Sequence, residues 1–276
     1  MNFPEHFTRT IQALYHEAET VVILNGEVSK PFRVHRGVRQ GDPLSCLIFN
    51  MAIESLAQML CSSNLSGFQV EGVAERLITI LFADDTTVYL SQADSFQDLN
   101  VILNRWCRSS GAKFNVQKTI IVPVGTQTYR EEVVSSHKIS PNQESIPLDI
   151  TIAPDGQAVR ALGAFVGNKI KNASIWTPIL ERIERLLAQW NKSKPTQLGR
   201  RLIISIVIGG LTQYLTRVQG MPAEIEDELT RKISQFMWDR GTPPVNAETL
   251  QLPTSKGGQS ILNLRVRNQA IDLMKC

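Results

Sequence analysis

Residues 78–90 read Ile-Thr-Ile-Leu-Phe-Ala-Asp-Asp-Thr-Thr-Val-Tyr-Leu, with two apolar runs on either side of an acidic pair, Asp84 and Asp85. The runs are rich in β-branched and aromatic residues, which favour β-strands. Aspartate tolerates the backbone conformations of tight turns and can hydrogen-bond its own backbone. The stretch therefore predicts a β-hairpin, with strands near 77–83 and 86–91 and an acidic tip.

The acidic pair has two interpretations. An acidic tip on a surface hairpin requires no function, because short motifs often arise by chance. Alternatively, adjacent carboxylates attract a hard divalent cation, and Mg²⁺ commonly binds one or two carboxylates together with substrate phosphates. Two such ions can stabilise both the attacking and the leaving oxygen of a phosphoryl transfer. Asp84 and Asp85 are therefore candidate metal ligands.

Upstream, residues 36–45 read Arg-Gly-Val-Arg-Gln-Gly-Asp-Pro-Leu-Ser. Asp42 followed by Pro43 is typical of an N-cap and the first residue of a helix, which we expect to run to about Leu60. The residues expected to face inward are Leu44, Leu47, Ile48, Met51, Leu56, Met59 and Leu60. A well-capped core helix after a basic loop explains this pattern, but helix N-termini also favour phosphate.

These two stretches, in this order and at this spacing, resemble palm motifs B and C of reverse transcriptases of non-LTR retrotransposons. The resemblance implies DNA synthesis on an RNA template with two Mg²⁺ ions, and it implies RNA template, RNA–DNA hybrid and deoxynucleotides as partners. It makes Asp84 and Asp85 catalytic metal ligands. The residues that it assigns to nucleotide and template binding are Arg36, Gly37, Arg39, Gln40 and Gly41.

Two further stretches extend the resemblance towards the end of the chain. Asn115 and Lys118 match motif D, in which a lysine near the leaving pyrophosphate can neutralise charge or donate a proton. A solvated lysine beside a strand is the alternative interpretation. Residues 146–152 and 157–166 are expected to be strands on either side of a turn at 154–156. Leu162 and Gly163 lie in the second strand and resemble motif E, which supports the primer end in this family. An ordinary hairpin with a glycine bulge is equally compatible with that pattern.

From about residue 174 the sequence predicts helices near 174–191, 195–218 and 222–240. Six basic residues and no acidic ones lie between Arg185 and Ala223, namely Arg185, Lys192, Lys194, Arg200, Arg201 and Arg217. A solvated face normally mixes both signs, whereas a one-signed stretch is typical of phosphate-backbone contact. By resemblance this is the thumb. The residues assigned to the nucleic-acid backbone are Lys192, Lys194, Arg200, Arg201 and Arg217.

Composition is that of an ordinary globular protein, with 276 residues, 42% hydrophobic, 20% charged and a net charge of +3. The four cysteines, Cys46, Cys61, Cys107 and Cys276, form no Cys-x-x-Cys pair, which predicts buried free thiols in a reducing, intracellular compartment. The run 202–211 is too short to span a membrane, so we expect no membrane association. Nucleus or cytoplasm, and the oligomeric state, stay open.

The fold expected is α+β, a partial polymerase palm with a small antiparallel sheet followed by a helical thumb. The expected divisions are 1–125 for motifs B to D, 126–170 for a loop and the motif E hairpin, and 171–276 for the thumb. In the family a motif A aspartate and the fingers precede this segment, and we expect both to be absent. The metal site is then incomplete, and the chain alone is inactive.

Two other outcomes stay open at this point. The chain is alternatively a non-catalytic remnant that binds nucleic acid or a partner, which the basic stretch supports. It is otherwise an unstable fragment, because removing the fingers exposes apolar palm surface and favours aggregation.

Overall fold

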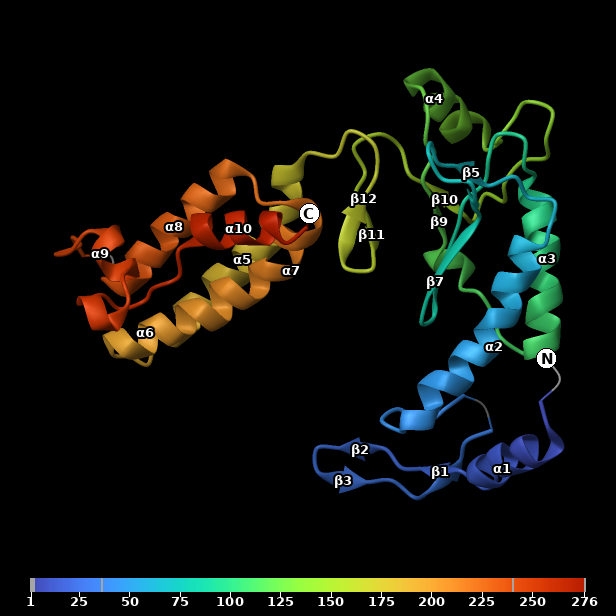
Figure 1. Cartoon of the computed structure of the whole chain (residues 1–276), viewed down its shortest axis with the longest axis horizontal. Helices are drawn as coiled ribbons and strands as arrows, with labels where there is room; N and C mark the ends of the chain where they lie inside the picture. Colours follow the sequence, from blue (N-terminus) through green and yellow to red (C-terminus); the bar gives the residue numbers. More distant parts are fainter. Residues whose placement is uncertain (1–2, 36, 240, 276) are drawn as a thin grey trace. The chain divides into compact units, whose positions relative to one another are not determined.

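The computed structural model describes residues 3–35, 37–239 and 241–275 (Figure 1). The chain forms two compact units, Met1–Lys113 and Phe114–Cys276. Both units combine helices with short strands, so the expected α+β class is confirmed. The finer boundaries after residues 125 and 170, and the division into palm and thumb, stay predictions. The expectation that the chain continues as a loop after residue 125 is wrong, because Gln127–Ser136 forms a helix.

The first unit contains helices and short antiparallel strand pairs. Its helices in the described residues are α1 (Glu5–Tyr15), α2 (Pro43–Cys61) and α3 (Phe96–Ser110). Its strand pairs are β1 (Glu19–Thr20) with β4 (Phe32–Arg33), β2 (Ile23–Leu24) with β3 (Glu27–Val28), β5 (Phe68–Gln69) with β6 (Arg76–Leu77), and β7 (Thr79–Phe82) with β8 (Asp85–Val88). Each strand is only two to four residues long, and the buried residues of this unit lie both in α2 and α3 and in the segments between the elements.

Helix α2 supports the β7–β8 hairpin, because it packs against both β7 and α3. Its buried apolar side chains, Leu56 and Leu60, lie in its second half, where Trp106 of α3 donates a 3.0 Å hydrogen bond to Ser55 Oγ. Leu47 and Met51 are 56% and 37% exposed, so the prediction that they face inward is wrong. The described part of this unit covers the second half of α2 more completely than the first.

The second unit is mainly helical. Its helices in the described residues are α4 (Gln127–Ser136), α5 (Asn172–Asn191), α6 (Gln197–Ile204), α7 (Gly210–Gln219), α8 (Ala223–Met237), α9 (Ala247–Gln251) and α10 (Leu264–Leu273), with single 3₁₀ turns at Val116–Lys118 and Thr254–Lys256. Strand β9 (Ile120–Ile121) pairs in parallel with β10 (Thr151–Ile152). Strand β11 (Val159–Ala161) forms an antiparallel hairpin with β12 (Ala164–Val166).

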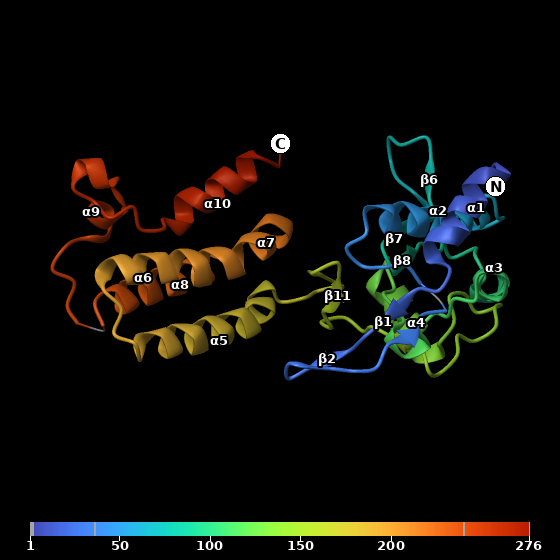
Figure 2. The same ribbon diagram turned by 90° about the horizontal axis from the view of Figure 1, so that it is seen from below.

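Helices α5 to α8 and α10 enclose the main apolar core, and Figure 2 shows α5 running alongside the line of α6 and α7. Trp176, Ile183, Ile204, Ile208 and Leu229 are almost completely buried there. The three helices expected near 174–191, 195–218 and 222–240 are confirmed, with ends shifted by up to three residues. The core of this unit therefore forms from the apolar periodicity that is visible in the sequence.

A π-helical turn, Ser205–Gly209, joins α6 to α7, and the sequence pattern does not reveal it. Arg267 of α10 donates hydrogen bonds to the Gly209 carbonyl (3.4 Å) and to Thr212 Oγ1 (2.8 Å) beside this turn. Burial lowers the pKa of the Arg267 guanidinium, and the charge of Glu226 opposes that shift. Arg267 therefore links α10 to the last residue of this turn.

Two described helical runs, α2 and Gln197–Gln219, are long and apolar enough to cross a membrane by length and composition alone. Core helices of soluble proteins share these properties, and Ile204 and Ile208 in the second run are fully buried. The absence of membrane association stays a prediction. Cys46 and Cys61 are free and exposed and Cys107 is free and half-buried, so the expectation that these thiols are buried is wrong. Cys276 lies outside the described residues.

Candidate functional site

The acidic pair lies at the tip of the β7–β8 hairpin, as the sequence predicts. Thr79 pairs with Val88 and Phe82 pairs with Asp85, which leaves Ala83 and Asp84 as a two-residue turn. Ala83 has a φ of 51°, in the left-handed region that residues with a Cβ rarely adopt. The hairpin is confirmed, with strands shorter than expected, and its turn fixes Asp85 as the first residue of β8.

Side chains alternate between the two faces of this hairpin. Leu81 and Thr86 are half-buried, whereas Ile80 and Phe82 are 44% and 64% exposed on the face that also carries Asp85. Both Asp84 and Asp85 are exposed. The two carboxylates are therefore accessible to a cation or a substrate, beside an apolar surface.

The donor set decides which metal site the residues can form. Within 3–35, 37–239 and 241–275, no group of three or more His, Cys, Asp or Glu side chains is placed to hold a metal ion. Two carboxylates suit Mg²⁺, which takes its other oxygen ligands from water and substrate phosphates. Asp84 and Asp85 therefore fit one ion of this kind, whereas a site for two ions needs further oxygen ligands.

The loop before α2 has the geometry that its glycines suggest. Gly37 and Gly41 have φ values of 90° and 89°, which are readily available only to glycine. Asp42 caps α2 by accepting a 2.9 Å hydrogen bond from the Leu44 amide, and Pro43 is the first helical residue. The predicted cap is confirmed. Arg36 lies outside the described residues.

Helix α1 holds the middle of this loop. The Arg39 guanidinium lies 5.8 Å from the centre of the Tyr15 ring, and its Nη2 donates a 3.5 Å hydrogen bond to the Leu14 carbonyl. The Tyr15 hydroxyl lies 3.0 Å from Ser45 Oγ on α2. Gln40 is exposed, so it is free to meet a ligand in solution. Binding of nucleotide by these residues stays a prediction.

Lys118 ends a single 3₁₀ turn, Val116–Lys118, and its side chain is exposed. Asn115 caps the turn by accepting a 3.2 Å hydrogen bond from the Lys118 amide. Lys118 belongs to the second unit, whereas the acidic pair belongs to the first. Its role beside a leaving pyrophosphate therefore stays a prediction.

Leu162 and Gly163 form the turn of the β11–β12 hairpin, so the expectation of one continuous strand over 157–166 is wrong. Their φ values are 49° and 82°, and two left-handed residues in succession are typical of the type I′ hairpin turn. A Cβ on Gly163 would lie 2.9 Å from Cε1 of Tyr214, so the turn accommodates only glycine without a shift of that ring. Leu162 is 46% exposed at the tip.

Two side chains of α7 hold this hairpin, and no motif in the sequence pointed to them. The Gln219 side-chain amide makes two hydrogen bonds with the main chain of Phe165 in β12. The Phe165 N–H donates to Gln219 Oε1 (3.1 Å), and Gln219 Nε2 donates to the Phe165 carbonyl (2.8 Å). The Tyr214 hydroxyl donates to the Leu162 carbonyl. A glutamine or tyrosine on a helix carries no sequence signal for a contact 54 or 52 positions away.

The basic residues fall into two groups. Arg185, Lys192, Lys194 and Arg217 are exposed, and Arg201 is half-buried. Arg200 is only 7% exposed. Its guanidinium stacks over the Phe236 ring at 5.2 Å, and it donates hydrogen bonds to the Pro195 and Phe236 carbonyls. The prediction that Arg200 contacts the nucleic-acid backbone is therefore corrected, because this side chain stabilises the helical core.

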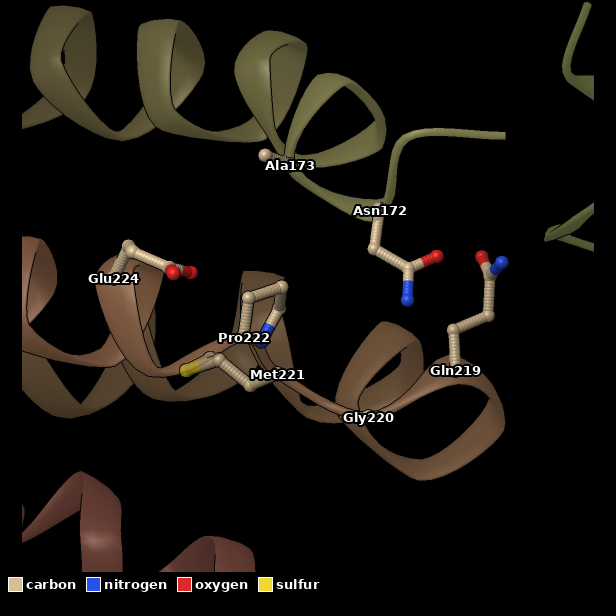
Figure 3. Close-up of a pocket in the computed structure, with 7 residues that line it drawn as sticks. All are labelled: Asn172, Ala173, Gln219, Gly220, Met221, Pro222 and Glu224. Carbon is tan, nitrogen blue, oxygen red and sulfur yellow. The ribbon is translucent and has the colours of Figure 1, made fainter. Parts of the chain in front are cut away.

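A cavity of about 310 Å³ lies between the start of α5 and the α7–α8 turn (Figure 3). Asn172 and Gln219 point into it from opposite sides, and Glu224 approaches from α8. None of the residues predicted to have a functional role lines it. The cavity adjoins the hairpin attachment through Gln219.

Asp94 is a buried carboxylate that the motifs did not indicate. It accepts hydrogen bonds from the amides of Ser66 (2.6 Å), Gly67 (2.9 Å) and Ser91 (2.8 Å). Burial raises the pKa of Asp94, but these backbone hydrogen bonds outweigh that effect and the net pKa is below its ordinary value. Asp94 thus joins the segment after α2 to the segment after β8.

The matches to known proteins agree with this arrangement. Residues 1–146 match the family model described as "Reverse transcriptase (RNA-dependent DNA polymerase)", which is more than half of the 276-residue chain. The chain therefore belongs to the reverse transcriptase family. The matched region contains the β7–β8 hairpin and the glycine loop before α2.

Similar proteins from transposable elements show which reverse transcriptases this chain resembles. The chain is 23% identical over 279 residues to the "Transposon TX1 uncharacterized 149 kDa protein" of Xenopus laevis, covering 96% of this chain and 19% of the relative. It is 21% identical over 194 residues to the "Retrovirus-related Pol polyprotein from type-1 retrotransposable element R2" of Popillia japonica, covering 68% and 30%. It is 30% identical over 127 residues to the "Retrovirus-related Pol polyprotein from type-2 retrotransposable element R2DM" of Drosophila melanogaster. That match covers 45% of this chain and 11% of the relative.

These relatives confirm the resemblance to reverse transcriptases of non-LTR retrotransposons. The chain spans less than a third of the length of each relative.

Proposed function

We propose that this chain takes part in DNA synthesis on an RNA template, with Asp84 and Asp85 as its metal-binding carboxylates. The observation that carries the proposal is the acidic pair exposed at the turn of the β7–β8 hairpin, in a chain of the reverse transcriptase family. Bound there with substrate phosphates, Mg²⁺ would stabilise the charge that develops during phosphoryl transfer. Both carboxylates would hold the ion.

The neighbouring elements have supporting roles in this proposal. Gln40 and the glycine loop, with Arg36 and Arg39, position the nucleotide and the template. Lys118 neutralises charge on the leaving pyrophosphate or donates a proton to it. The β11–β12 hairpin supports the primer end through its exposed turn at Leu162.

The second, mainly helical unit binds the RNA–DNA hybrid by contacts with the phosphate backbone of that duplex. The side chains proposed for these contacts are the exposed Lys192, Lys194 and Arg217 and the half-buried Arg201, and Arg185 is exposed in the same one-signed stretch. Contacts of this kind fix the position of the duplex and read its A-form shape, but carry little sequence information. Arg200 is left out because its guanidinium is buried.

We further propose that the 276-residue chain does not synthesise DNA by itself. Support comes from the donor set, since the described residues place no third acidic or imidazole group with Asp84 and Asp85. Phosphoryl transfer depends on positioned metal ions, so a site for two ions needs further ligands. The alternative function, binding of nucleic acid without catalysis, is supported by the exposed basic side chains.

Binding of Mn²⁺ in place of Mg²⁺ tests the metal assignment. Electron paramagnetic resonance would measure Mn²⁺ retained by the chain in complex with an RNA–DNA hybrid and a deoxynucleotide. We expect Asp84→Asn with Asp85→Asn to lower the amount retained. The matched control, Glu131→Gln with Glu132→Gln, removes another adjacent and exposed acidic pair and should leave it unchanged. Equal loss of Mn²⁺ in both double variants would remove the metal assignment.

Fluorescence anisotropy with a labelled hybrid tests the alternative. Affinity that falls as salt rises and persists in EDTA supports backbone contact, because each phosphate contact releases counterions. Retention of the hybrid in EDTA, together with Mn²⁺ binding that the Asp84 and Asp85 variants do not change, would favour a purely nucleic-acid-binding function.

A further inference from the structure

The β11–β12 hairpin is too small to hold its own position. It has three paired residues on each strand, and an isolated two-stranded hairpin is at best marginally stable in water. Its exposed turn can support a primer end only if something outside the hairpin fixes its orientation. The contacts between the hairpin and the rest of its unit therefore determine whether the turn has a fixed orientation.

Gln219 contacts the hairpin as a neighbouring strand would. Its amide both accepts from and donates to the main chain of Phe165, at 3.1 and 2.8 Å, which occupies the free edge of β12. The Phe165 side chain also packs against the helical core. Gln219 is the last residue of α7, and the following Gly220 closes the helix with a 2.9 Å hydrogen bond to the Thr216 carbonyl. The amide therefore projects from the hydrogen-bonded last turn of α7.

Tyr214 makes a second attachment, at the turn. Its hydroxyl donates to the Leu162 carbonyl, and its ring lies so close to Gly163 that a Cβ there would be 2.9 Å from Cε1. Tyr214 and Gln219 thus hold the hairpin at its tip and along its second strand. Attachment at two separate points restricts rotation as well as translation.

We propose that Tyr214 and Gln219 are positioning residues, which attach the primer-supporting hairpin to α7 so that the hairpin and the helical bundle move as one body. The inference rests on the proposed function for its primer role, while the attachment itself rests on the contacts alone. A primer end held by the turn would then keep a fixed relation to the duplex bound by the helices.

The first test measures amide hydrogen exchange across residues 159–166 in the full chain. Gln219→Glu replaces the donating amide with a carboxylate facing the Phe165 carbonyl, and we expect exchange in the hairpin to rise about tenfold. The matched control is Gln213→Glu, which makes the same change at an exposed position of α7. It should leave hairpin exchange unchanged. Tyr214→Phe keeps the ring and removes one hydrogen bond, so a rise of about threefold is expected.

The second test follows the primer. A hybrid whose primer ends in 4-thiothymidine should form photo-crosslinks to the turn at 162–163 in the unaltered chain. Gln219→Glu should reduce those crosslinks while the anisotropy-measured affinity for the hybrid stays the same. A purely structural role would lower affinity and crosslinking together.

The outcomes separate the two proposals. Unchanged hairpin exchange in both Gln219→Glu and Tyr214→Phe would overturn the attachment. Raised exchange with undiminished crosslinking would overturn the positioning role. Failure of the unaltered chain to bind the hybrid would instead overturn the proposed function and the primer role with it, and the exchange data would still decide the attachment.

Discussion

Phe82 pairs with Asp85 across a two-residue turn, and this register holds Ala83 at a φ of 51° directly before Asp84. A non-glycine residue in the left-handed region costs about 1–2 kcal/mol. The hairpin therefore carries backbone strain next to the two carboxylates assigned to the metal. Strain of this kind often occurs at functional sites, where the surrounding structure maintains it.

Ala83→Gly should relieve this strain. We expect the substitution to stabilise the hairpin by about 0.5–1 kcal/mol, because glycine adopts the left-handed region without a Cβ penalty. Amide exchange of residues 79–88 at increasing urea concentration would measure the change. Ala52→Gly, at an exposed position inside α2, is the matched control and should destabilise by about 1 kcal/mol. The same loss of stability at both positions would show that the Ala83 backbone is unstrained.

Asp94 should make stability depend on pH in the acid range. Its pKa in the folded chain is below the ordinary value of 3.8, so the stabilisation is fully present above that value. It is lost as the pH falls through the lower, folded-state pKa. Asp94→Asn should cost about 1–3 kcal/mol near neutral pH and flatten the acid limb of the stability profile.

Urea unfolding between neutral pH and about pH 2 would measure both effects. Parallel acid limbs for the unaltered chain and the Asp94→Asn variant would contradict the assignment, since another group would then cause the acid sensitivity.

Gly163→Ala should destabilise the hairpin through two separate effects. Alanine is disfavoured at the Gly163 φ of 82°, and its Cβ would lie 2.9 Å from Cε1 of the Tyr214 ring. Gly156→Ala provides the control, because Gly156 has a φ of 88° and open space around its Cβ. We expect about 1 kcal/mol from the backbone at either site, and about 1 kcal/mol more at Gly163 from the ring. Thermal unfolding measures the difference, which should vanish in a Tyr214→Ala background.

Substitutions of the adjacent Arg200 and Arg201 should have different effects, the first on the stability of the fold and the second on the affinity for the RNA–DNA hybrid. Arg200→Ala removes a buried guanidinium that stacks on Phe236 and binds two carbonyls, so we expect a loss of about 2–3 kcal/mol in unfolding free energy. Arg201→Ala should leave stability nearly unchanged. It should instead weaken hybrid binding and reduce the slope of affinity against salt by about one counterion. The opposite assignment of the two effects would contradict the proposed binding surface.

Local patterns allowed part of this structure to be predicted. The β7–β8 hairpin follows from alternating β-branched residues around Asp84 and Asp85, and the α2 cap follows from Asp42 before Pro43. Both depend on interactions within a few residues. The apolar periodicity of the helical unit was equally informative, since its helices bury one continuous face.

What could not be predicted depends on contacts between distant residues. Arg200 and Arg201 are adjacent in a basic stretch, and only the position of Phe236 decides which of them is buried. The orientation of Leu47 and Met51 depends on how much of α2 its neighbours cover. Gln219 acquires its role from Phe165, 54 residues away. No spacing rule in the sequence encodes these three relationships.

The central proposal is that the chain has the acidic pair and the nucleic-acid surface of a reverse transcriptase but lacks a complete metal site. Primer extension on an RNA template tests this proposal most directly. The measurement compares the chain with its Asp84→Ala, Asp85→Ala variant in Mg²⁺, after hybrid binding has been established for both. We expect no extension from either protein. Extension by the unaltered chain that disappears in the variant would contradict the claim, because a complete metal site would then exist within these 276 residues.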